Sequence, residues 1–297
     1  MTKQDAINLL TQKDQLQLLS FYDTLTPQQQ ENLLAQIEGI DWSLLDVLKT
    51  HETVNARGTF APLSAMELSQ IDANRAHLEE VGLQAIREGK VAAVLLAGGQ
   101  GTRLGFDKPK GMYNIGVTRE LYIFECLINN VMEVVKKAGA WIPFYIMTSD
   151  KNYDDTTAFL KEKNYFGYNA EYIHFFKQDM APSVDYNGKL LMEAPDRLSL
   201  SPNGNGGWFS SLCRYGYDKQ MKEAGVEWLT AFAVDNVLQR INDPAFVGAV
   251  IDSGCDCGGM VVRKADPNER VGVLCTEDGK PSIVEYYEMT EDMIHLK

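Results

Sequence analysis

Glycines and cations are concentrated between Gly98 and Lys110, a combination of residue types that could bind an anion. Glycine has no Cβ, so a ligand can approach its main chain closely, and successive N–H groups in a turn can converge on one phosphate. Arg103, Lys108 and Lys110 follow within reach and would add positive charge. The stretch therefore predicts a phosphate-binding loop.

The spacing of these glycines differs from that of two familiar phosphate loops. A P-loop needs Gly-Lys-Ser or Gly-Lys-Thr after four spacers, and no such run follows Gly98. The dinucleotide fingerprint needs a glycine where this chain has Leu104, and glycine returns only at Gly105. A tight turn between a strand and a helix, without a ligand, is the alternative. It would not explain the arginine and the two lysines.

Two polar side chains and a second glycine-rich turn could act together with this loop. Gln178 ends a predicted strand, and its amide could pair with a nucleobase edge, although a solvated glutamine is the simpler alternative. Asp235 closes the apolar run 228–234, and its oxygen atoms suit Mg²⁺ shared with phosphates. The alternative is an aspartate that caps the turn before Val237. Residues 204–207, Gly-Asn-Gly-Gly, form a second loop that a ligand could approach closely.

The elements that must hold these residues alternate between strands and helices from residue 90 onward. The apolar run 91–97 is too short for a typical helix and predicts a buried parallel strand. Asn187-Gly188 is typical of a hairpin turn. Further strands are expected at 142–147, 171–176, 227–234, 259–264, 271–275 and 282–287, and helices at 119–138, 153–163, 208–224 and 243–253. This alternation predicts an α/β fold with a mostly parallel sheet.

Residues 1–89 have helical spacing and are expected to form a separate helical segment before the α/β domain at 90–297. Thr26 fits the N-cap of a helix, with Pro27 at its first position and Gln29 closing a capping box. A second short helix is expected from Asp41, a linker at 58–62 and a longer helix at 64–88.

The charge and the cysteine content of the sequence limit the kinds of partner and compartment that are expected. The 297 residues have a formal net charge of −13 and an isoelectric point near 4.8, which argues against binding to nucleic acid or to an anionic membrane. An apolar stretch of membrane-spanning length and a secretory signal are both missing from the sequence. Five cysteines favour a reduced, cytoplasmic protein, and Cys255 and Cys257 lack the second ligand pair of a zinc site.

These motifs together resemble those of a known family. The stretch 96–105, Leu-Ala-Gly-Gly-Gln-Gly-Thr-Arg-Leu-Gly, followed by Pro-Lys-Gly-Met-Tyr at 109–113, resembles the signature of the eukaryotic-type UDP-sugar pyrophosphorylases. The UDP-N-acetylhexosamine pyrophosphorylases are the most similar branch. Matching pieces recur in order at 175–178, 202–207, 234–236, 256–258, 267–272 and 284–286. The resemblance covers residues 90 to 290 and implies a Rossmann-like nucleotidyltransferase fold with a mostly parallel mixed sheet.

The resemblance also implies an activity. Such an enzyme joins N-acetylglucosamine 1-phosphate to UTP by in-line attack on the α-phosphorus, with Mg²⁺, and releases a UDP-sugar and pyrophosphate. Glucose 1-phosphate is the alternative acceptor. Two other classes stay open, a piece that binds nucleotide without turnover and a purely structural protein.

The resemblance implies a role for each matching residue. Arg103 would face the departing pyrophosphate and Lys110 the α-phosphate. Lys108 precedes a proline and is interpreted as a solvated side chain. Gln178 would bind uracil, and Asp235 would bind the metal ion. Other nucleotide contacts would come from Leu96, Ala97, Gly98, Gly99, Gly101 and Gly204, and the sugar contacts from Asn205, Gly272, Glu285 and Tyr286.

The family also has a small C-terminal β domain, for which this sequence shows no counterpart. Residues 289–297 have the composition of a helix start with no closing element. The sequence is therefore expected to be part of a longer protein.

Overall fold

The computed structural model describes residues 1–43, 45 and 58–294, which fall into two compact units. The first unit comprises Met1–Thr50 and Leu83–Asp243, and the second comprises His51–Gly82 and Pro244–Lys297. The division after residue 89 that the sequence suggests stays a prediction. None of the described helices is long and apolar enough to cross a membrane.

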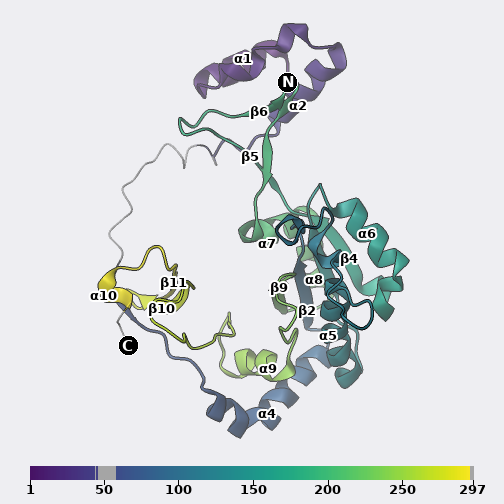
Figure 1. Cartoon of the computed structure of the whole chain (residues 1–297), viewed down its shortest axis with the longest axis vertical. Helices are drawn as coiled ribbons and strands as arrows, with labels where there is room; N and C mark the ends of the chain where they lie inside the picture. Colours follow the sequence, from purple (N-terminus) through teal and green to yellow (C-terminus); the bar gives the residue numbers. More distant parts are fainter. Residues whose placement is uncertain (44, 46–57, 295–297) are drawn as a thin grey trace. The chain divides into compact units, whose positions relative to one another are not determined.

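A four-stranded parallel sheet forms the centre of the first unit (Figure 1). The strand order is β4-β3-β2-β9, with bounds Ile173–Lys177, Phe144–Thr148, Val91–Leu96 and Trp228–Ala233. Strand β2 pairs in parallel with β3 on one side and with β9 on the other. Burial on both faces of the sheet explains why the β2 sequence is apolar throughout. The α/β fold with a parallel sheet is confirmed.

Helices connect these strands and cover the sheet. Helix α5 buries Phe124, Leu127, Ile128 and Val131 at helical spacing, and it ends at Gly139, whose φ is 71°. Side chains of α7 (Trp208–Arg214) and α8 (Tyr217–Glu223) pack on one face of the sheet. There Leu212 and Met221 join Val94, Tyr145 and Phe176 in one cluster. The helices of this unit are α1 Lys3–Gln12, α2 Pro27–Glu38, α5 Ile123–Ala138, α6 Tyr153–Glu162, α7 Trp208–Arg214 and α8 Tyr217–Glu223.

The single helix expected at 208–224 is wrong, because the chain breaks into α7 and α8 at Gly216, whose φ is 76°. Short 3₁₀ turns occupy Leu16–Leu19, Tyr22–Thr24, Thr102–Leu104, Lys110–Met112, Asn164–Gly167, Ala170–Tyr172 and Asn205–Gly207. The capping box at Thr26 and Gln29 is confirmed. The short helix expected after Asp41 lies almost entirely outside the described residues.

A long insertion between β4 and α7 reaches the N-terminal helices. Strands β5 (Met180–Pro182) and β8 (Leu200–Pro202) form an antiparallel ribbon. The antiparallel pair β6 (Met192–Ala194) and β7 (Arg197–Leu198) lies between them in the sequence. The predicted turn at Asn187-Gly188 lies in this insertion, with Gly188 at φ 73° and an isolated bridge between Val184 and Leu190.

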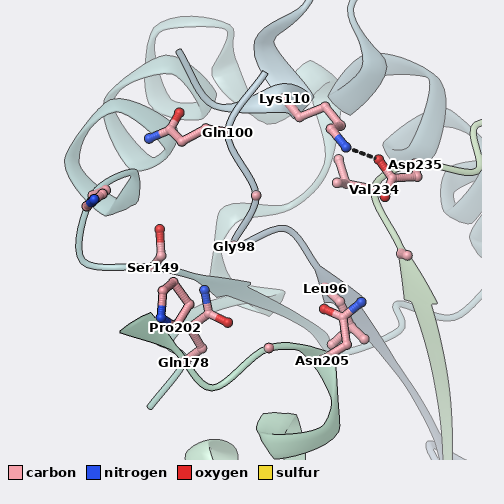
Figure 2. A pocket seen from close by; sticks show the side chains of 14 residues that line it. Leu96, Gly98, Gln100, Lys110, Ser149, Gln178, Pro202, Asn205, Val234 and Asp235 are labelled. Carbon is pink, nitrogen blue, oxygen red and sulfur yellow. Dashed lines mark hydrogen bonds and ion pairs between the residues drawn. The ribbon is translucent and has the colours of Figure 1, made fainter. Parts of the chain in front are cut away.

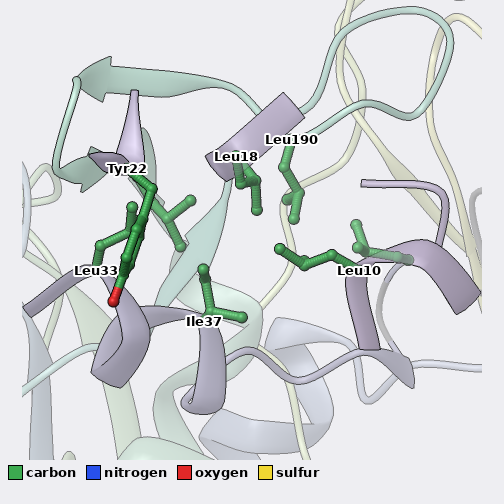
Figure 3. Close-up of a cluster of buried hydrophobic side chains, with 8 residues drawn as sticks. Leu10, Leu18, Tyr22, Leu33, Ile37 and Leu190 are labelled. Atoms are coloured by element: carbon green, nitrogen blue, oxygen red, sulfur yellow. The ribbon is translucent and has the colours of Figure 1, made fainter. Parts of the chain in front are cut away.

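The N-terminal helices and the insertion share one apolar cluster (Figure 3). Leu10, Leu18, Tyr22, Leu33 and Ile37 bury their side chains against residues of the insertion, and the cluster is completed by Leu45, Leu190 and Leu198. We call this set the N-terminal cluster. Its buried residues fall on one face of each helix, as the helical spacing of residues 1–50 predicts.

Glutamine side chains tie the same two segments together. The Gln15 amide donates to the Gly188 carbonyl at 2.9 Å and accepts from the Leu190 N–H at 2.9 Å. The Gln36 amide donates to the Asp196 carbonyl at 2.9 Å and accepts from the Leu198 N–H at 3.0 Å. Each amide thus supplies the donor and acceptor that a neighbouring strand would supply.

The second unit has its own three-stranded antiparallel sheet. Strands β1 (Phe60–Pro62), β10 (Val273–Glu277) and β11 (Lys280–Val284) pair in that order, with a tight turn at Asp278-Gly279. The linker expected at 58–62 is therefore wrong in part, because its second half is β1. The strand expected at 259–264 is also wrong: no described strand pairs with it, and Val262 is 93% exposed.

Helices α4 (Leu68–Arg87), α9 (Pro244–Asp252) and α10 (Glu291–Ile294) are the remaining helices of the described chain. Within the second unit, α9 approaches α4 closely at Gly248. A Cβ at that position would lie 1.8 Å from the Leu78 carbonyl oxygen, so only glycine fits there. Of the helical segment expected at 289–297, residues 295–297 lie outside the described residues.

Candidate functional site

A pocket of about 330 Å³ lies at the carboxyl ends of all four strands of the parallel sheet (Figure 2). Strand β2 leads into Leu96–Gln100, β3 into Ser149 and Lys151, β4 into Gln178, and β9 into Val234 and Asp235. Parallel strands bring their carboxyl ends to one edge, which is where open α/β sheets bind ligands. The fold therefore assembles this pocket from segments far apart in the sequence.

The glycine loop presents unpaired N–H groups to this pocket. Within the described part of the chain, the N–H groups of Gly98, Gly99 and Gln100 have no protein partner. The loop is closed behind them, because the Gly101 N–H donates to the Lys108 carbonyl at 2.9 Å and the Lys110 N–H donates to the Gly99 carbonyl at 3.3 Å. Three consecutive unpaired donors beside a cavity are suited to an anion.

The two first glycines of the loop have different surroundings. A Cβ on Gly98 would lie 2.4 Å from Nε2 of Gln178, so that glycine lets the loop approach the glutamine side chain. A Cβ on Gly99 would meet no protein atom within 4 Å and would project into open space. Protein packing therefore accounts for Gly98, whereas Gly99 leaves room that a ligand can use.

A lysine and an aspartate meet at the edge of the pocket. The Lys110 ammonium donates to the Asp235 carboxylate, and the side chains are 20% and 63% exposed, respectively. Lys110 follows the glycine loop, and Asp235 follows β9, so the pair joins two loops at neighbouring strand ends. Both charges line the same cavity as the unpaired N–H groups.

The opposite wall contains Gln178 and the second glycine loop. Gln178 is only 6% exposed, and its backbone N–H donates to the Thr148 carbonyl at 2.8 Å. Its side-chain amide makes no hydrogen bond to any described residue, although Figure 2 shows it at the cavity wall. Gly204, at φ 76° and ψ −169°, has a conformation that essentially only glycine adopts, and it places Asn205 at the pocket.

A second ion pair lies at the rim. The Lys177 ammonium donates to the Asp150 carboxylate at 3.0 Å. This hydrogen bond raises the pKa of Lys177 above its ordinary value. Lys151, next in sequence to Asp150, lines the pocket and brings a further positive charge to it.

The structure brings together most of the residues predicted for the site. The predicted residues that line the pocket are Leu96, Gly98, Gly99, Lys110, Gln178, Gly204, Asn205 and Asp235. Ala97, Gly101 and Arg103 belong to the same loop but do not line the pocket, and the Arg103 side chain is exposed.

The three remaining sugar-binding candidates belong to the second unit, so their predicted contact with a sugar stays a prediction. Within that unit Gly272 and Glu285 are neighbours, since a Cβ on Gly272 would lie 3.3 Å from a Glu285 carboxylate oxygen. Tyr286 follows Glu285 and is 44% exposed.

Sequence reasoning missed several pocket residues. They are Gln100, Ser149, Lys151, Pro202, Ala233 and Val234. Ser149 and Lys151 directly follow an expected strand, so the rule that ligands lie at strand carboxyl ends could have found them. Pro202 follows from no local pattern, because its place depends on the β5/β8 ribbon.

The acidic side chains at the pocket determine whether it could hold a divalent cation. The described residues contain no cluster of three or more His, Cys, Asp or Glu side chains that could hold a metal ion by themselves. Asp235 is the carboxylate that lines the pocket. Mg²⁺ commonly takes one or two carboxylates and completes its shell with water and substrate phosphates, so the arrangement fits a Mg²⁺ ion shared with a nucleotide.

Comparison with known proteins gives one family. Residues 31–296 match the family described as UTP–glucose-1-phosphate uridylyltransferase. The chain is 34% identical over 315 residues to UDP-N-acetylhexosamine pyrophosphorylase-like protein 1 of Mus musculus, covering 98% of this chain and 62% of that protein. It is 34% identical over 312 residues to UDP-N-acetylglucosamine pyrophosphorylase of Saccharomyces cerevisiae, covering 99% and 65%, respectively.

A solved structure agrees with these relatives. The crystal structure of uridine diphosphate N-acetylglucosamine pyrophosphorylase from Trypanosoma brucei, in complex with an inhibitor, has a TM-score of 0.82 and 29% identity. It covers 97% of this chain and 62% of that one. The chain thus spans less than two thirds of the length of these relatives. The resemblance and fold inferred from the sequence are confirmed.

Proposed function

The chain belongs to the UTP–glucose-1-phosphate uridylyltransferase family, and on this premise we propose that it transfers a uridylyl group from UTP to N-acetylglucosamine 1-phosphate. The products are UDP-N-acetylglucosamine and pyrophosphate. The observation that supports this proposal most directly is the lining of the pocket. Three unpaired N–H groups and the Lys110 cation lie on one side of it, and the Gln178 amide, which has no protein partner, lies on another. Glucose 1-phosphate is the second acceptor to be considered, because it is named in the family description.

Gln178 is proposed to recognise the uracil base. A carboxamide offers one acceptor and two donors, and uracil offers a neighbouring N–H and carbonyl. The Gln178 amide lines the pocket without a protein partner, so its donor and acceptor are available to a base. This role predicts that UTP binds more tightly than CTP, whose base has a different donor and acceptor pattern.

The glycine loop and Lys110 are proposed to hold the phosphates. The N–H groups of Gly98, Gly99 and Gln100 would bind phosphate oxygens, and the Lys110 ammonium would stabilise negative charge on the α-phosphate as the sugar phosphate attacks it. Arg103 would face the departing pyrophosphate. In-line displacement at phosphorus needs positioning and neutralisation of charge more than covalent help, and these residues supply both.

Asp235 is proposed to hold Mg²⁺ together with the nucleotide phosphates. When bound, the ion would neutralise phosphate charge and polarise the phosphoryl group. Asp235 contacts Lys110, so the carboxylate would also orient the ammonium toward the α-phosphate. Asn205, which lines the same pocket, would contact the sugar. The free cysteines support a cytoplasmic setting.

The test is an assay of pyrophosphate release with UTP and each sugar 1-phosphate, in parallel with calorimetric titration of UTP. Turnover with N-acetylglucosamine 1-phosphate above that with glucose 1-phosphate supports the proposal, and the reverse order favours the second acceptor. A protein that does not bind UTP would refute the proposed function.

One observation favours a second candidate, a nucleotide-binding protein without turnover. The pocket is lined by most of the expected nucleotide contacts, but of the four expected sugar contacts Asn205 alone lines it. Tight binding of UTP with no pyrophosphate release for any hexose 1-phosphate would select this candidate.

A further inference from the structure

We propose that Asn152 is a positioning residue that aims the N–H groups of Gly98 and Gln100 at the phosphates of the nucleotide. This inference rests on the proposed function, and it concerns a residue that lies behind the glycine loop rather than in the pocket lining. Asn152 is fully buried, at 0% exposure.

Asn152 contacts the loop on the side of its carbonyl groups. Its Nδ2 donates to the Ala97 carbonyl at 3.0 Å and to the Gly99 carbonyl at 3.4 Å. Its Oδ1 accepts from the Ser149 N–H at 2.7 Å. Because Ser149 N–H can only donate, it fixes which end of the amide is oxygen, and the NH₂ group must then face the two carbonyls.

The geometry of the peptide bond transmits this contact to the pocket. In a trans peptide the carbonyl of one residue and the N–H of the next point in opposite directions, and the described chain has no cis peptides. The Ala97 carbonyl shares a peptide plane with the Gly98 N–H, and the Gly99 carbonyl shares one with the Gln100 N–H. One amide that holds both carbonyls on the inner side therefore turns both N–H groups outward, away from Asn152.

Asn152 is itself anchored to the sheet. It follows β3, and its own N–H donates to the Ser149 carbonyl at 3.2 Å. The neighbouring residue Thr148 accepts from the Gln178 N–H at 2.8 Å, which ties this turn to the end of β4. The glycine loop is thus connected, through Asn152 and Ser149, to the same strand ends that hold Gln178.

The local sequence would assign Asn152 a different task. It occupies the N-cap position of α6, where an asparagine oxygen usually accepts an N–H of the first helical turn. Its side chain makes no such bond here, so α6 forgoes that capping bond. The Asn152 side chain thus bonds to the glycine loop instead of to its own helix. This difference distinguishes a positioning role from ordinary helix capping.

The test compares two substitutions of Asn152 with a matched control. Asn152→Ala removes all three contacts. Asn152→Asp keeps the shape, the acceptor for Ser149 and a good helix cap, but it replaces the NH₂ donor with an oxygen that repels both carbonyls. Thr156→Ala is the control, because Thr156 lies one turn further along α6 and is equally buried, at 0% exposure, with no hydrogen-bond partner for its hydroxyl in the described chain.

Dissociation constants are measured by calorimetry for UTP, uridine and inorganic tripolyphosphate, alongside thermal unfolding. We expect both Asn152 variants to weaken UTP and tripolyphosphate by about tenfold or more while uridine changes by less than about twofold. Thr156→Ala should leave all three constants within about twofold even where it lowers the melting temperature.

Equal losses for UTP and uridine, or losses that the Thr156 control shares, would overturn the positioning role. The proposed function fails in a different way. Wild-type protein that binds tripolyphosphate without preferring UTP would refute the uridylyl role, and the tripolyphosphate titrations would still decide the role of Asn152. Wild-type protein that binds none of the three ligands would refute both.

Discussion

Lys110 and Asp235, 125 positions apart in the sequence, form an ion pair at the edge of the pocket (Figure 2). The lysine is largely buried, whereas the carboxylate is mostly exposed. The pair therefore keeps the ammonium beside the glycine loop before any nucleotide is bound. A phosphate that enters the pocket meets a cation that is already in place.

Replacing Lys110 with methionine should abolish most of the activity while the fold persists. Loss of one preorganised group that stabilises transition-state charge typically costs about 10²–10³ in turnover. The measurement is the turnover number for pyrophosphate release at saturating UTP. Lys108→Met is the matched control, because Lys108 is exposed and its side chain has no partner among the described residues. Similar losses in both variants would contradict a specific role for Lys110.

Asp235→Asn should raise the Mg²⁺ concentration needed for half-maximal activity by about tenfold or more, because an amide oxygen is a weaker ligand for a hard cation than a carboxylate. The measurement is the initial rate at fixed UTP across a Mg²⁺ titration. Asp150→Asn serves as the control, since Asp150 pairs with Lys177 at the rim instead of lining the pocket. An unchanged Mg²⁺ dependence in Asp235→Asn would remove this residue from the metal site.

Two glycine substitutions should separate binding from folding. Gly99→Ala adds a methyl group that meets no protein atom within 4 Å, so the free energy of unfolding should change by less than about 1 kcal/mol while UTP affinity falls. In Gly111→Ala the added atom would lie 2.3 Å from the Phe124 ring, which is fully buried, and stability should fall by about 1–3 kcal/mol or more. Urea unfolding and UTP titration of both variants provide the check. Normal UTP affinity in Gly99→Ala would place the nucleotide elsewhere.

Gln15→Ala should destabilise the first unit. The substitution leaves the Leu190 N–H and the Gly188 carbonyl without their present partner, and an unpaired buried polar group costs about 1–3 kcal/mol. Gln4→Ala is the control, because its side chain bonds only to exposed Asn8 on the same helix. Equal unfolding midpoints for the two variants in urea would show that the Gln15 contacts add nothing to stability.

Stability should also depend on pH through His174. Burial lowers the pKa of His174 below its ordinary value, and the ring stacks on Tyr145 at 4.8 Å between centroids. The unfolded chain then binds more protons just below pH 6.5 than the folded chain does, so this contribution to stability is present above that value and declines as the pH falls through it.

The measurement is urea unfolding at about pH 7.5 and about pH 5.5, on either side of the ordinary histidine pKa. His174→Phe keeps the stacking and removes the titration, so its stability should fall less between the two conditions than that of the wild type. A fall of the same size in both proteins would assign the pH dependence to other groups.

Much of the pocket could be predicted because its signals are local. The apolar run 91–97 marks a buried strand, and glycines, cations or polar residues after three of the expected strands mark the edge where ligands bind. Gln178 and Asp235 reach the same cavity for that reason.

What could not be predicted depends on contacts between distant segments. Residues 60–62 look like a linker and become a strand because β10 lies beside them, whereas 259–264 look like a strand and find no partner in the described chain. Asn152 resembles an ordinary helix cap, and its true partners are carbonyl groups 53 and 55 positions earlier. Pairing of this kind is set by tertiary structure, so local patterns do not reveal it.

The ties between the N-terminal helices and the insertion also set an order of events during synthesis. Gln15 and Leu190 are 175 positions apart, and Gln36 and Leu198 are 162 apart. The apolar faces of α1 and α2 therefore leave the ribosome long before the segment that covers them. Leu10, Leu33 and Ile37 lack the contacts with the insertion until residue 198 has emerged. Asp235 follows soon afterwards, so the N-terminal cluster closes and the pocket is completed at nearly the same stage of translation.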